Sequence, residues 1–91
     1  MNTQTTFDRL AHQIAEHGTA TEAHALETLS SHAASTHPGA AAALVDWNGS
    51  EVSRLRAYSV VVGVLQRDLS RDALEAVCGH VESGAATSIA A

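Results

Sequence analysis

The spacing of apolar and polar residues along the chain predicts five helices. Between residues 6 and 17, Phe7, Leu10 and Ile14 recur every three or four positions, as on one face of a helix. Similar patterns, separated by capping and turn signals, predict four more helices at residues 20–35, 38–47, 50–69 and 71–83. The helix at 20–35 has the weakest apolar face, so we expect it to fray or to end early.

The predicted helix at residues 50–69 differs because apolar residues extend around nearly its whole circumference. Val60, Val61, Val64 and Leu65 widen its apolar seam, and a helix that is apolar all round is typically buried. A strand at 58–66 is the competing interpretation, since β-branched residues favour sheets, but no second segment is suited to pair with it. We therefore predict an all-α fold, a compact bundle of four to five short helices around this central helix.

The length of 91 residues predicts one domain. We expect residues 1–84 to form a single helical domain and residues 85–91, which are small and polar, to be a disordered tail. Apolar residues make up 45% of the chain, but most are alanines and only 3% of the residues are aromatic. The predicted core is therefore thin, and self-association would add to its stability.

The net charge of −5 with histidine neutral, and the absence of lysine, limit the choice of partners. Binding to nucleic acid or to an anionic membrane requires a basic surface, so we expect neither. No segment approaches the roughly 20 apolar residues of a membrane span, and a lone cysteine, Cys78, favours a cytoplasmic location. The composition resembles that of accessory proteins from actinobacteria or their phages.

The sequence lacks the motifs of catalysis and cofactor binding. Cys78 falls on the apolar side of its helix, where cysteine is usually a small core residue. The chain has no Gly-x-Ser-x-Gly nucleophile turn and no glycine-rich phosphate loop. Asp68 and Asp72 lie at a helix junction, where carboxylates usually cap a turn. We predict a protein that is not an enzyme and binds no cofactor.

Histidine is the unusual component, since five of the six histidines lie within residues 12–37. A metal site needs three or four ligands from two or more elements, and the first two predicted helices supply one candidate group: His12, Glu16, His24 and His32. Their spacing matches no metal-ligand motif. Exposed polar residues are therefore the favoured interpretation, and a metal-binding or pH-responsive regulator is the alternative.

The best candidates for binding a protein partner lie around one predicted helix junction: Trp47, Arg54, Arg56 and Tyr58. These residue types dominate the energetics of protein interfaces. Trp47 is equally suited to the core, and the two arginines can pair with Glu51 or Asp46 instead.

Residues 48–58 also resemble, superficially, the turn and second helix of a helix-turn-helix. The acidic charge and the apolar character of the following helix favour an ordinary helical hairpin, which makes a DNA-binding regulator a further alternative. The sequence as a whole predicts a small interaction or regulatory module that binds another protein and forms a homodimer.

Overall fold

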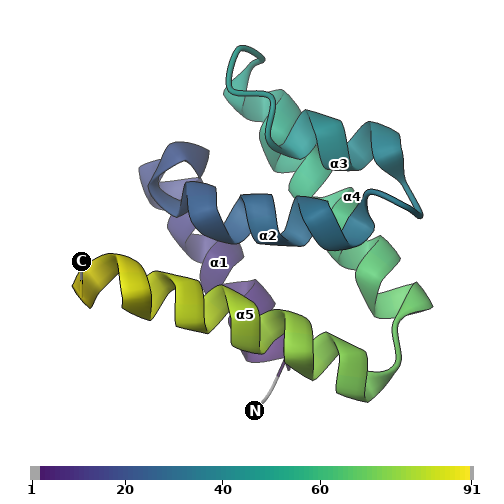
Figure 1. Ribbon diagram of the computed structural model, residues 1–91. Helices are drawn as coiled ribbons and strands as arrows, with labels where there is room; N and C mark the ends of the chain where they lie inside the picture. The colour runs from purple at the N-terminus through teal and green to yellow at the C-terminus, as the bar shows by residue number, and fades with distance from the viewer. Residues whose placement is uncertain (1–2, 91) are drawn as a thin grey trace.

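The computed structural model describes the backbone of residues 3–90 and the side chains of residues 3–83. The elements are α1 (Thr3–His17), the short 3-10 helix η1 (Thr19–Glu22), α2 (Ala23–Ala33), α3 (Pro38–Leu44), α4 (Glu51–Asp68) and α5 (Arg71–Ala90) (Figure 1). The described residues contain no strand, and α4 covers the segment for which a strand was the alternative. The predicted all-α bundle is confirmed. Within the described residues, no helix is long and apolar enough to cross a membrane.

Local signals account for most helix ends. The Ser50 hydroxyl accepts the Ser53 N–H at 3.1 Å, and the Ser70 hydroxyl accepts the Ala73 N–H at 3.2 Å, so each serine satisfies a backbone donor in a first turn. Gly18 separates α1 from η1 with a φ of +94°, a conformation that glycine adopts without a steric penalty. The His37 imidazole is an unforeseen cap, since its Nδ1 accepts the Ala40 N–H at 3.1 Å.

Four predicted helices differ from the structure by more than one residue at an end. Helix α1 begins at Thr3, three residues before its predicted start. The segment at 20–35 is divided into η1 and α2: Thr19 and Glu22 have the spacing of a capping box, but Thr19 bonds to Glu51 instead. Helix α3 ends at Leu44, so Trp47 lies in the turn before α4. Helix α5 continues past Gly84 to Ala90. The side chains after Ser83 lie outside the described residues, and the disorder expected of residues 85–91 stays a prediction.

Helix α2 shares the centre of the bundle with α4. It packs against η1, α3, α4 and α5, whereas α4 packs against η1, α1, α2 and α3 (Figure 1). The apolar face of α2 is complete despite its alanines, since Leu26, Leu29 and Ala33 are fully buried. The Ser30 hydroxyl donates to the Ala41 carbonyl oxygen at 2.7 Å, so the one polar side chain on this face is satisfied. The weak apolar face expected of this segment is therefore wrong, but the segment does end early, since α2 stops at Ala33, two residues before the predicted end.

Helix α4 buries one face only. Its buried residues are Ala57, Tyr58, Val61, Val64 and Leu65. On the opposite side, Val52 and Val60 remain 57% and 43% exposed. The inner half of its circumference is covered by α1, α2, α3 and η1, and no described element covers the outer half. Within one copy of the chain the other helices therefore do not wrap α4 completely, and coverage of its outer half by a second chain stays a prediction.

Candidate functional site

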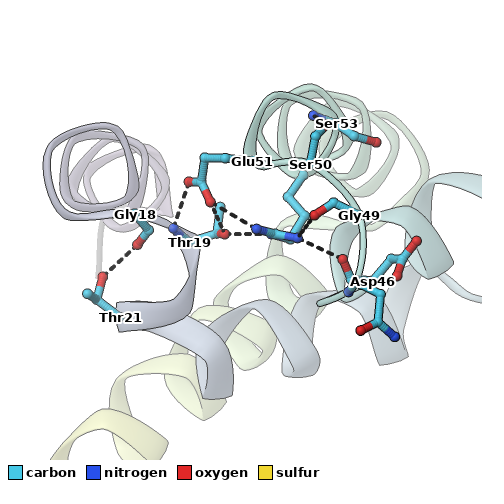
Figure 2. A network of polar contacts seen from close by, with 10 residues as sticks. Gly18, Thr19, Thr21, Asp46, Gly49, Ser50, Glu51 and Ser53 are labelled. Carbon is cyan, nitrogen blue, oxygen red and sulfur yellow. Dashed lines mark hydrogen bonds and ion pairs between the residues drawn. The ribbon is translucent and has the colours of Figure 1, made fainter.

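A polar network joins the first turn of α4 to η1 and to the turn after α3 (Figure 2). Its centre is the Arg54 guanidinium. Nε donates to the Thr19 hydroxyl at 2.8 Å, and Nη1 donates to the carbonyl oxygens of Asp46 and Gly49 at 2.8 and 2.7 Å. Nη2 contacts Glu51 Oε1 at 3.2 Å. Only 11% of the side chain is exposed, so Arg54 holds three segments together and is not available to a partner.

Glu51 completes the network from the other side. Its carboxylate accepts the Thr19 N–H at 2.8 Å and the Thr19 hydroxyl at 2.7 Å (Figure 2). These hydrogen bonds, assisted by Arg54, lower the pKa of Glu51 below its usual value, because each of them favours the ionised carboxylate. The sequence-based alternative that Arg54 pairs with Glu51 is therefore confirmed.

Trp47 lies against this network and is only partly covered by it. The Arg54 guanidinium carbon sits 5.3 Å from the centroid of the indole ring, within the range of a cation–π contact. The residue remains 39% exposed. Because Arg54 is held by its hydrogen bonds, one face of the indole ring lies against an ordered guanidinium group, and the rest of the side chain is partly exposed to solvent. Trp47 thus belongs partly to the fold and partly to the surface.

Tyr58 belongs to the core. Its hydroxyl donates to the Phe7 carbonyl oxygen at 2.7 Å and thereby ties α4 to α1. The residue is buried, and burial raises its pKa far above the usual value, since the phenolate would lose its hydration. The assignment of Tyr58 to a partner-binding surface is therefore wrong. The helical period was the overlooked signal, because Tyr58 shares a face with Val61 and Leu65.

Arg56 is the predicted binding residue that stays on the surface. It is exposed, and it forms no hydrogen bond or ion pair with any described residue, whereas the other four arginines do: Arg9 with Glu82, Arg54 with Glu51, Arg67 with Asp68 and Arg71 with Glu75.

The neighbours of Arg56 at helical spacing are all exposed. We define the outer face of α4 as the following set: Val52, Arg56, Ser59, Val60 and Gly63. A side-chain carbon added at Gly63 would meet nothing within 4 Å among the described atoms. From residue 52 to residue 67 the sequence has three arginines and no acidic residue. Arg54 is held in the network and Arg67 pairs with Asp68, so Arg56 is the one charged residue of this otherwise apolar and small-residue face.

The four candidate metal ligands do not converge. His12 Nε2 lies 3.3 Å from Glu16 Oε1 on the surface of α1, but His24 and His32 do not join them. Among the described residues, no group of three or more histidine, cysteine or acidic side chains is placed to hold a metal ion. His32 instead stacks on His80 of α5, with ring centroids 5.9 Å apart and planes 26° apart. No local pattern in the sequence indicates this pair, since 48 positions separate its members.

Cys78 lies on the inner side of α5, as expected of a small core residue. It is fully buried, and burial raises the pKa of its thiol.

Comparisons with family models, with curated proteins and with solved structures find no match to this chain.

Proposed function

We propose that this chain is a non-enzymatic interaction module that binds another protein through the outer face of α4. One observation carries the proposal. Two of the three large hydrophobic residues exposed in the described part of the chain, Val52 and Val60, lie two turns apart on one helix face. Arg56 lies between them with no described partner. Burying the exposed parts of the two valines amounts to burying about one whole valine, which contributes roughly 1.5–3 kcal/mol, so Arg56 must add to the affinity.

The charge of this face indicates the chemistry of the partner. Arg56 is the one charged residue of the outer face of α4, so the face is complementary to an apolar surface that carries a carboxylate. A second copy of the chain is the other candidate, because the open space beside Gly63 would let a second helix approach closely. In a symmetric pairing of two outer faces, however, each face would bring its own Arg56 and no carboxylate.

The remaining features support the same kind of role. The buried thiol of Cys78, with its raised pKa, is unsuited to nucleophilic attack. A single unpaired cysteine also supports a cytoplasmic location. The Arg54 network makes the first turn of α4 rigid, and a rigid helix loses little entropy when it docks.

Site-specific photo-crosslinking in the native host tests the proposal. A photoreactive amino acid at Val60 should crosslink to one predominant other protein, and the same group at the exposed Ala76 of α5 should not. Arg56→Glu in the Val60 variant should abolish the crosslink, because it places a carboxylate against an acidic partner.

Equal crosslinking at positions 60 and 76 would refute the use of this face. A crosslink from position 60 to the chain itself, together with a dimer in sedimentation velocity, would replace the acidic partner by a second copy. The matched variant Arg71→Glu makes the same charge change at an exposed side chain of α5, and reports whether the effect is specific to Arg56.

A further inference from the structure

The second surface feature lies on the other side of the bundle, where α2 and α5 pack side by side (Figure 1). The buried faces of the two helices hold Leu29 and Ala33 on α2 and Val77 and Val81 on α5. His32 and His80 are both exposed and meet at the edge of this contact, with ring centroids 5.9 Å apart. Two solvent-exposed imidazoles from different helices thus lie together beside the buried contact between α2 and α5.

We propose that His32 and His80 form a two-histidine site for a divalent transition-metal ion such as Zn²⁺ or Ni²⁺. Each neutral imidazole offers one nitrogen lone pair, and imidazole suits these ions. Two imidazoles that bind one Zn²⁺ through nitrogens about 2.1 Å away place their ring centroids roughly 5–6 Å apart. The observed separation of 5.9 Å lies in this range. Because the rings are stacked and each lone pair lies in its ring plane, both side chains must rotate to aim one nitrogen at the ion.

The site would be open. No further histidine, cysteine or acidic side chain among the described residues completes a group of three, so water or an external ligand fills the remaining positions. Two protein ligands give weaker binding than the three or four of most zinc sites. A metal bound here would link α5 to α2, and it would act independently of the outer face of α4.

Thermal unfolding of the full chain, followed by circular dichroism at pH 7.5, tests the site. With NiCl2 or ZnCl2 at about ten times the dissociation constant, mass action predicts a rise in melting temperature of about 5–10 °C. His32→Ala and His80→Ala should each abolish the rise. His12→Ala and His24→Ala, which remove exposed histidines elsewhere, should retain it. At pH 5.5 the rise should disappear, because protonated imidazole does not bind metal.

NMR of the wild-type chain gives a readout that does not depend on any variant. Zinc should shift the ring signals of His32 and His80 first among the six histidines. Two results would overturn the proposal. One is the absence of any rise in melting temperature at about 1 mM metal. The other is a rise that is unchanged in both His32→Ala and His80→Ala. Shifts led by His12 or His24 would also overturn it.

Discussion

Arg54 and Arg56 offer a direct test of the structure, because they are the same residue type two positions apart on α4. Arg54→Ala removes hydrogen bonds to Thr19, Asp46, Gly49 and Glu51, as well as the contact with the Trp47 ring. Arg56→Ala removes an exposed side chain that has no described partner. The two variants have the same composition and the same gain in helix propensity, so their difference isolates the network.

The expected loss for Arg54→Ala is about 2–4 kcal/mol of unfolding free energy. A hydrogen bond to a charged group contributes roughly 1.5–3 kcal/mol, and bonds that share one group do not add in full. The side chain is 11% exposed, so water replaces few of the lost bonds. For a chain of this length the loss corresponds to a fall in melting temperature of about 10–20 °C. Arg56→Ala should stay within about 0.5 kcal/mol of wild type.

Urea denaturation followed by circular dichroism measures both values. Arg54→Lys should recover less than half of the loss, because an ammonium group cannot reach four acceptors in the fixed fork of a guanidinium. Losses below about 1 kcal/mol for Arg54→Ala, or equal losses for the two alanine variants, would refute the assignment of Arg54 to the fold.

Three further variants test other parts of the structure. Glu51→Gln should destabilise the chain at pH 7, and the difference from wild type should shrink as the pH falls: the folded pKa of Glu51 lies below its ordinary value, chiefly through its hydrogen bond from Thr19, so its contribution is fully present above the ordinary value and is lost as the pH falls through the folded pKa. Urea denaturation at a series of pH values measures this, and a difference independent of pH would contradict it. Tyr58→Phe should cost about 1–2 kcal/mol, because it removes the buried hydrogen bond by which α4 is tied to the Phe7 carbonyl oxygen of α1; an unchanged urea midpoint would show that this bond is absent. Leu26→Ala should cost about 2–5 kcal/mol in the centre of the bundle, whereas Val52→Ala should cost under 1 kcal/mol, and equal losses would place α2 outside the core.

The helices could be predicted because the signals that define them are local. Ser50, Ser70 and Pro38 mark helix starts within one turn of themselves, and Gly18 marks the end of α1. The failure at Thr19 shows the limit of such signals. Its spacing from Glu22 fits a capping box, but the carboxylate it contacts is that of Glu51, 32 positions away, and no local pattern reports that choice.

The candidate site could be predicted only in part, and helical phase explains which residues reach the surface. Residue type and nearness in sequence group four residues together: Trp47, Arg54, Arg56 and Tyr58. On a helix, however, Arg54 lies on the side of Tyr58 and Val61, and Arg56 on the opposite side. Phase alone could have separated them. The pairing of His32 with His80 could not have been found in this way, because it depends on how α2 and α5 pack.

Trp47 gives the chain an intrinsic optical reporter. It is the only tryptophan, and its ring lies beneath the guanidinium that joins η1 to α4. Indole fluorescence therefore monitors this one junction, whereas far-ultraviolet circular dichroism monitors all the helices together. When the two signals change at the same denaturant concentration, the junction opens only as the whole domain unfolds. An earlier change in emission would mark the junction as a separately opening unit, with a free energy of its own.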